Sequence, residues 1–132
     1  MSAQLMKKQE EAPARAGSRS GSIPGANEVR LVGRISQQPA ERVLPSGDTV
    51  WTFRVVVPRD GAPGRSRQTV DSLECAVWGG RIRRSVATWR VDDVVEVTGA
   101  LRRRFFRAGG SAVSRVEVEV TGGRVIRRAA SA

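Results

Sequence analysis

Five short stretches of this sequence alternate apolar with polar residues, and this alternation constrains the fold more than any other feature. Successive side chains of a β-strand point to opposite faces, so a period of two predicts a strand with one buried face. The stretches are EVRLVGRI (28–35), TVWTFRVVV (49–57), SLECAVW (72–78), DVVEVTGAL (93–101) and VSRVEVEV (113–120). In the first of them Gly33 takes the place of an apolar side chain, which indicates a bulge or a close approach of two backbones.

One further segment, RIRRSVATWR (81–90), has a helical period instead. Its apolar residues Ile82, Val86 and Trp89 recur at i, i+4 and i+7, which predicts a short helix with one buried face. The outward positions include Arg81, Arg83, Arg84 and Arg90. The order is three strands, one helix and two strands. We therefore expect an all-β protein with one short helix, an OB-fold, which is a five-stranded Greek-key barrel.

The charge of the chain is strongly basic. Its 132 residues include 23 Lys and Arg against 13 Asp and Glu, which gives a formal net charge of +10. Only Lys7 and Lys8 are lysines, and 23 minus 2 leaves 21 arginines. Arginine grips phosphate with its planar fork and stacks on bases with its flat face, which favours a nucleic-acid partner. A solvated basic surface explains the same composition, so charge alone leaves both interpretations open.

The sequence has few of the residues that catalysis or metal binding requires. The chain has one cysteine and no histidine, so it offers no internal disulfide and no ordinary zinc site. Its carboxylates are scattered, whereas a nuclease needs them clustered around a metal ion. Cys75 alternates onto the apolar face of its strand, as a small buried hydrophobe does. We expect no enzymatic activity, no cofactor and no small-molecule substrate.

The composition divides the chain into three parts. Residues 1–26 are rich in Gly, Pro and Ser and predict a disordered arm, which leads to a single domain at 27–128 and a short tail at 129–132. Residues 58–68, PRDGAPGRSRQ, predict a long exposed loop. No apolar run approaches the roughly 18 to 20 residues of a membrane span, and the N-terminus does not resemble a secretory signal. We expect a cytoplasmic protein with no membrane partner.

Taken in order, three parts of the chain resemble the bacterial single-stranded DNA-binding protein family, from about Asn27 to Val120. NEVRLVGRI resembles the first strand of that family, and AVWGGRIRRSVATWRVDDVVEVTGALRRRF resembles its third strand, helix and fourth strand, which ends at Gly99. QQPAERVLPSGDTVWTF resembles its pattern of proline, arginine, turn glycine and core aromatic, here Pro39, Arg42, Gly47 and Phe53. The resemblance implies a non-catalytic homotetramer that binds single-stranded DNA during replication, recombination or repair.

The candidate binding residues are aromatic side chains and arginines, most of them in the stretch that joins the fourth and fifth strands. By resemblance, Trp78 and Phe106 occupy positions where the family stacks bases, and the alternation separately places Trp78 opposite the apolar face of its strand. A subunit contact is the alternative role for Trp78. The stretch LRRRFFRAGG (101–110) joins strands four and five, where such a fold flanks its ligand. The candidates for phosphate contact are Arg54, Arg102, Arg103, Arg104 and Arg107.

Strand parity separates the two adjacent phenylalanines. Phe105 continues the inward parity of Leu101, and Phe106 points outward, so we expect Phe106 as the principal DNA contact and Phe105 as a second candidate. Trp51 has the parity of Phe53, and Trp89 lies on the buried edge of the helix, so we expect less direct contact from both.

Two features depart from the family pattern. Ser72 stands where many members carry a stacking tryptophan, and Pro58 and Arg59 stand near another such position, so we expect fewer stacked bases and a greater reliance on charge. The sequence ends in RVIRRAASA instead of an acidic tip, which favours an accessory-type member. The alternative function is a basic OB-fold accessory protein that acts through protein or RNA contacts in a primosome-like complex.

Overall fold

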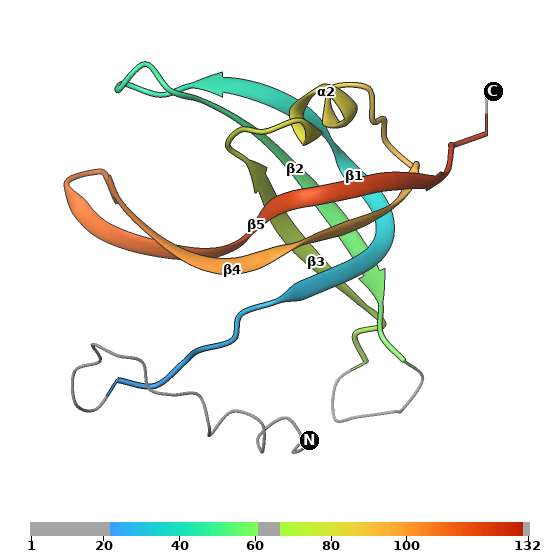
Figure 1. Ribbon diagram of the computed structural model, residues 1–132, viewed down its shortest axis with the longest axis horizontal. Coiled ribbons are helices and arrows are strands. Elements are labelled where there is room, and N and C mark those ends of the chain that lie inside the picture. The colour runs from blue at the N-terminus through green and yellow to red at the C-terminus, as the bar shows by residue number, and fades with distance from the viewer. Residues whose placement is uncertain (1–21, 61–66, 131–132) are drawn as a thin grey trace.

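The computed structural model describes residues 22–60 and 67–130, which form five strands and one short helix. The elements are β1 (Val29–Val43), β2 (Thr49–Pro58), β3 (Val70–Val77), α2 (Ile82–Val86), β4 (Val94–Ala108) and β5 (Ser111–Arg127). The strands close into a barrel in the order β1-β2-β3-β5-β4, with β3 and β5 parallel and every other pair antiparallel (Figure 1). The predicted all-β OB-fold with one short helix is confirmed.

Most of the predicted arm at 1–26, part of the predicted loop at 58–68 and the end of the predicted tail at 129–132 lie outside the described residues. Among the described helices, none is long and apolar enough to cross a membrane.

Strand β1 is longer than the sequence predicts, because it continues through QQPAERV to Val43. Its first half pairs with β4 and its second half with β2, and two register shifts between Ile35 and Ala40 bend it from one partner to the other. Pro39 lies in this irregular part, where a residue without an N–H is tolerated. At Gly33 a Cβ would lie 2.3 Å from the carbonyl oxygen of Val56, so the predicted close backbone approach is confirmed.

The barrel interior is filled by the apolar face of each strand. Its largest buried side chains are Trp89 and Phe53, whose ring centroids lie 5.5 Å apart in an edge-to-face contact. Ile82 and Val86 of α2 are buried as predicted. Trp89, predicted on the same helix, instead follows its last residue and is buried in the core together with them. The Trp89 ring lies so close to Gly123 that a Cβ there would be 2.9 Å from it. Residue 123 therefore has to be small.

A buried carboxylate fastens the C-terminal segment to the turn before β4. Asp93 is 1% exposed and accepts hydrogen bonds from the backbone N–H of Arg90 at 2.9 Å and of Ala129 at 2.8 Å. Arg128 reaches the same carboxylate at 3.0 Å and also donates to the carbonyl of Thr88. Asp93 thus stabilises two segments that lie 36 residues apart in sequence.

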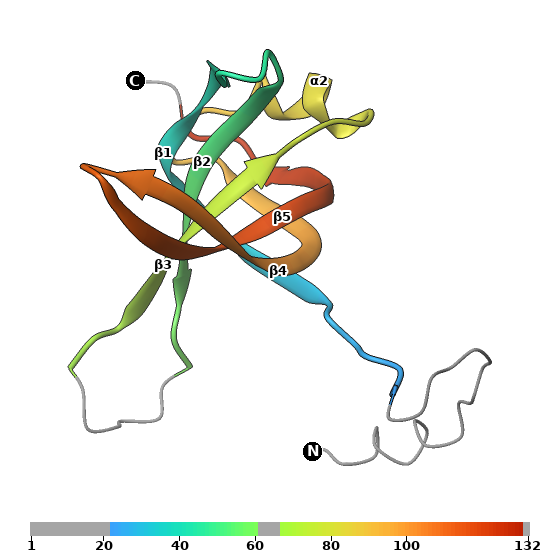
Figure 2. The ribbon, with the colours of Figure 1, turned by 90° about the vertical axis from the view of Figure 1, so that its left-hand side faces the viewer.

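The hairpin of β4 and β5 continues well beyond the barrel as a two-stranded ribbon (Figure 2). Here the expectation that Phe105 points into the core is wrong. The fourth strand also does not end at Gly99, because β4 continues to Ala108 and includes most of the stretch 101–110. Phe105 is 76% exposed and Val116 45% exposed, and Leu101 at the start of the ribbon is 46% exposed. Strand parity is kept, but the ribbon has no opposing layer on its inward side. Side chains on this side therefore remain open to solvent.

The buried thiol of Cys75 gives a simple test of the barrel. Burial, and to a lesser extent the nearby carboxylates Glu74 and Glu117, raise the pKa of Cys75 to about 12. Because the thiolate is the reactive form, we expect the native protein to react with iodoacetamide far more slowly than the urea-unfolded chain at pH 8. Mass spectrometry of alkylated samples measures this difference. Equal rates in the two states would contradict a closed barrel around β3.

Candidate nucleic-acid interface

The outer face of β2 and β3 lies beside the ribbon. Arg54 on β2 is opposite Glu74 on β3, and Thr52 is opposite Ala76, so these four residues share the outward side of the two strands, where Ala76 is covered by its neighbours. Ala76 is in turn paired with Glu119 of β5, which joins this face to the fifth strand. The candidate site is thus part of one continuous surface that runs from β2 through β3 to β5.

The surface continues onto one side of the β4–β5 ribbon. In the register of this hairpin Arg104 is opposite Arg115, Phe106 is opposite Val113, and Arg102 is opposite Glu117. Residues two apart on a strand share a side, so these side chains form a single ladder. We call the surface formed by Arg54, Glu74, Trp78, Arg102, Arg104, Phe106, Arg115, Glu117 and Glu119 the outer face.

Trp78 follows β3 directly and lies against the ribbon. The guanidinium carbon of Arg104 is 4.6 Å from the centre of its ring, so a cation covers one aromatic surface. The indole Nε1 is buried and has no hydrogen-bond partner among the described residues. One edge of the ring is therefore held inside the protein, which fixes its orientation on the outer face.

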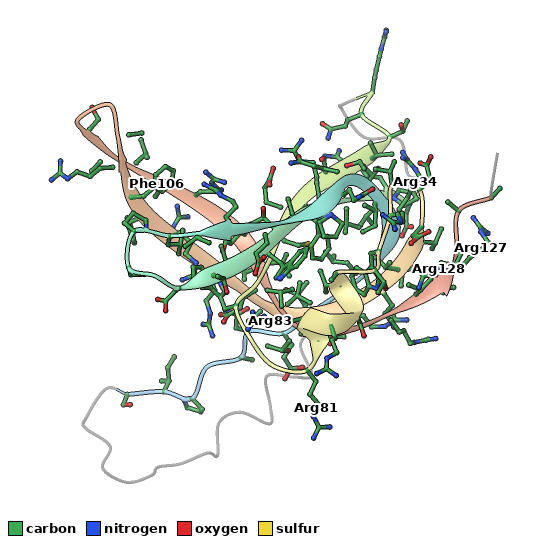
Figure 3. All side chains as sticks on the ribbon, turned by 90° about the horizontal axis from the view of Figure 1, so that it is seen from above. Arg34, Arg81, Arg83, Phe106, Arg127 and Arg128 are labelled. Atoms are coloured by element: carbon green, nitrogen blue, oxygen red, sulfur yellow. The ribbon has the colours of Figure 1, made fainter. Side chains whose placement is uncertain are left out.

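Phe106 has a matching arrangement further along the ribbon. The guanidinium carbon of Arg115 lies 5.1 Å from the centre of the Phe106 ring, and the side chain is 39% exposed. Phe105 points to the opposite side of the ribbon, where its register partner is Ser114. Figure 3 shows Phe106 on the hairpin, far from the arginines of α2. Of the two phenylalanines, the structure places Phe106 on the same face as Trp78.

Three of the five predicted phosphate contacts are ion-paired on this face. Arg54 Nε donates to Glu74 at 2.8 Å, Arg102 to Glu119 at 2.6 Å and Arg104 to Glu117 at 3.0 Å. The other two make only neutral contacts. Arg103 donates to the Ser114 hydroxyl at 3.1 Å, and Arg107 to the Gly110 carbonyl at 3.4 Å. Arg103 and Arg107 share the parity of Phe105 and lie on the opposite side of the ribbon, and glutamates neutralise most of the charge on the outer face itself.

Sequence reasoning missed these glutamates and Arg115 as members of the site. The alternation of the last strand does place Arg115, Glu117 and Glu119 outward together. Their pairing with β4 depends on the hairpin register, which the alternation leaves open by any even number of residues. The tight turn at Gly109 and Gly110, both with positive φ, sets this register.

The energies of these contacts favour exchange. An exposed cation–π contact is worth roughly 0.5 to 1 kcal/mol, and an exposed ion pair about 0.2 to 1 kcal/mol. A base stacked on an aromatic ring is worth about 1 to 3 kcal/mol. Stacking is therefore strong enough for a ligand with flat, electron-rich groups and negative charges to displace Arg104 and Arg115 from the rings.

The described residues do not group in the way that a metal site requires. Within residues 22–60 and 67–130, no three side chains of His, Cys, Asp or Glu gather closely enough to hold a metal ion.

The chain resembles known proteins over most of its length. Residues 26–126 match the sequence model of the single-strand binding protein family. The single-stranded DNA-binding protein 3 of Listeria innocua is 40% identical over 52 residues, which are 39% of this chain and 32% of that protein. The single-stranded DNA-binding protein of Bacillus cereus is 30% identical over 78 residues, which are 59% of this chain and 46% of that protein. The chain thus spans less than half the length of these two relatives.

A solved structure has the same fold. It is described as a Plasmodium falciparum SSB complex with ssDNA, and it superposes with a TM-score of 0.64 at 21% identity. The superposition covers 80% of this chain and 97% of that one. At this identity the similarity concerns the arrangement of the barrel. The family match, which covers residues 26–126, carries the assignment, and the chain belongs to the single-strand binding protein family.

Proposed function

We propose that this protein binds single-stranded DNA without marked sequence preference, through base stacking on Trp78 and Phe106. The observation that carries the proposal is the outer face itself, on which two aromatic rings lie beneath two arginines. Every base has a flat face and every nucleotide a phosphate, so such a surface binds a single strand whatever its sequence. The names of the relatives from Listeria innocua and Bacillus cereus support the same partner.

In the proposed mechanism the arginines change partners. A base takes the place of the Arg104 guanidinium over Trp78, and the released guanidinium turns to a backbone phosphate. Arg115 does the same at Phe106. Each exchange replaces a weak contact with a base stack and adds a charge-assisted bond to phosphate. The free protein therefore keeps its rings covered until a single strand arrives.

Competition binding tests this function. A fluorescently labelled oligo(dT) is bound to the protein, and unlabelled oligo(dT), duplex DNA and RNA then compete for it at several salt concentrations. We expect oligo(dT) to compete best and its affinity to fall as salt rises. If duplex DNA competes as well as oligo(dT), the stacking mechanism is wrong.

We expect that substitution of the glutamates on the outer face increases the affinity for single-stranded DNA. Glu117→Gln with Glu119→Gln releases Arg104 and Arg102 from their ion pairs, and two more phosphates can then be neutralised. We expect roughly 5-fold tighter binding of oligo(dT) at low salt, and a salt dependence steeper by about 1.4, which is 0.7 for each added contact. Fluorescence anisotropy over a salt series measures both quantities.

The matched control is Glu96→Gln. Glu96 also holds two arginines, Arg30 and Arg124, but it lies earlier on β4, outside the outer face. This variant removes a carboxylate charge without freeing Arg102 or Arg104. If the control and the double variant gain the same affinity for each carboxylate removed, then net charge controls the affinity, and the local exchange of arginine partners does not.

The wider roles of the protein follow from its family. We propose that it protects single-stranded DNA during replication, recombination or repair in the cytoplasm, without catalytic activity, and that it assembles as a homotetramer. Light scattering at micromolar concentration tests the assembly, for which we expect about four times the monomer mass. A monomer at that concentration would refute the homotetramer without affecting the DNA-binding proposal.

One observation favours a second function, contact with another protein. Leu101, Phe105 and Val116 form an exposed, mainly apolar strip, interrupted by Arg103, on the side of the ribbon opposite Phe106. This strip fits the alternative of an accessory protein that acts through protein contacts. The same competition experiment decides between the two, because an accessory protein of this kind shows no preference for oligo(dT) over duplex DNA.

A further inference from the structure

A groove of about 880 Å³ lies outside the surface described so far, between the β1–β2 hairpin and α2. Glu41 and Trp51 line it from the hairpin, and they are register partners on β1 and β2. The helix side contributes three arginines and two small residues: Gly80, Arg81, Arg83, Arg84 and Ala87. We call this space the helix groove.

The walls of the helix groove are held in place. Trp51 is half-buried and packs against the barrel core, and its remaining surface lines the groove. Ile82 and Val86 anchor α2 in the core. Arg83 donates to the Thr49 hydroxyl at 3.4 Å, which joins the helix to β2. A ligand entering the groove thus meets a preformed surface.

The charges of the helix groove suit an anion. Three arginines face one carboxylate, Glu41, and neither Arg81 nor Arg84 makes an ion pair within residues 22–60 and 67–130. This differs from the outer face, where glutamates hold most of the arginines. Figure 3 shows Arg81 and Arg83 at α2, apart from Arg34 and Arg127. An indole beside unpaired guanidinium groups matches a base with its phosphates.

A short open path leads from the outer face to the helix groove. Trp78 is followed by Gly79 and Gly80, and a Cβ added at either glycine would meet no atom within 4 Å. Gly80 has φ +85° and turns the chain toward α2. A nucleic-acid strand lying on Trp78 can therefore cross these two residues, which carry no side chains of their own.

From these observations we infer that the helix groove is a second subsite for the same single strand, in which Trp51 contacts a base and Arg81 and Arg84 contact phosphates. The inference rests on the proposed function and extends it. A strand bound first at Trp78 gains the second subsite when it is long enough to cross Gly79 and Gly80. The protein then binds long strands more tightly than short ones.

The test compares two lengths of oligo(dT), about 8 and about 30 nucleotides, where one OB-fold covers roughly 4 to 16. We expect Arg81→Ala with Arg84→Ala to leave the 8-mer affinity nearly unchanged and to weaken the 30-mer by roughly 5-fold or more, with a salt slope shallower by about 1.4. The matched control is Arg34→Ala with Arg127→Ala, which removes the same charge from a different surface, where both residues line a separate pocket with Val32 and Val94. Equal losses in the two variants, or no loss for the 30-mer, would overturn the inference.

Fluorescence gives a second readout that does not depend on charge. In a Trp78→Phe background, we expect the 30-mer to quench tryptophan emission and the 8-mer to do so much less. A further Trp51→Phe substitution, which keeps an aromatic ring in the barrel wall, should abolish this quenching. If the quenching persists, Trp51 does not contact the strand. Failure of the proposed function looks different, because the unmodified protein would then not prefer oligo(dT) at all.

Discussion

Replacing Trp78 and Phe106 together by alanine should lower the affinity for oligo(dT) by roughly 30-fold or more. Each ring is proposed to stack one base, and each stack is worth about 1 to 3 kcal/mol, so the pair contributes at least about 2 kcal/mol. Both rings lie on the surface of the barrel or ribbon, and their loss removes little of the core. Fluorescence anisotropy with a labelled oligo(dT) measures the change at fixed salt.

Phe105→Ala is the matched control for this experiment. Phe105 is adjacent in sequence and more exposed than Phe106, but it points to the opposite side of the ribbon. We expect its replacement to change the affinity less than 3-fold, a difference of about 0.6 kcal/mol. A loss as large as that of Phe106→Ala would show that the strand does not select the outer face.

The second large effect concerns stability. Asp93→Ala should lower the free energy of unfolding by about 2 to 4 kcal/mol, because it leaves the N–H groups of Arg90 and Ala129 without their acceptor in a buried place. For a domain of this size that loss corresponds to a decrease in Tm of roughly 10 °C or more. Thermal unfolding followed by circular dichroism measures it. An unchanged Tm would mean that the C-terminal segment contributes nothing to the fold.

The same carboxylate predicts a pH dependence. Burial alone would raise the pKa of Asp93, but hydrogen bonds from Ala129, Arg90 and Arg128 outweigh it and hold the pKa below its ordinary value. The stabilisation is therefore complete above about pH 4 and is lost as the pH falls through the lowered pKa. The difference in Tm between the parent and Asp93→Ala should shrink in acid. Asp93→Asn, which retains one acceptor oxygen, should fall between the two at pH 7.

The barrel was predictable because the sequence patterns that specify its strands and its helix are local. Alternation identifies five strands, the i, i+4, i+7 spacing of Ile82, Val86 and Trp89 identifies the helix, and their order matches one known barrel. The extension of β1 past Ile35 was not predictable, since bulges around Pro39 interrupt its alternation. The exposure of Phe105 was missed for a different reason. Parity tells which side of a strand a residue occupies, but not whether another layer covers that side.

The candidate site was predictable in its aromatic members and less so in its electrostatics. Trp78 and Phe106 lie on one face, as the resemblance and the parity of each strand indicate. The pairing of Arg102 and Arg104 with glutamates depends on diagonal contacts across the hairpin, which single-strand patterns do not show. The helix groove could not be predicted from the sequence either, because it combines β1, β2 and α2, which meet only in the folded barrel.

The most direct test of the account is the tryptophan emission of the parent and of Trp78→Phe during titration with an 8-nucleotide oligo(dT). We predict strong quenching at saturation in the parent and the loss of most of it in the variant, since Trp89 is buried in the core and Trp51 lies in the helix groove. Tight binding of the 8-mer with equal quenching in both proteins would contradict base stacking on Trp78.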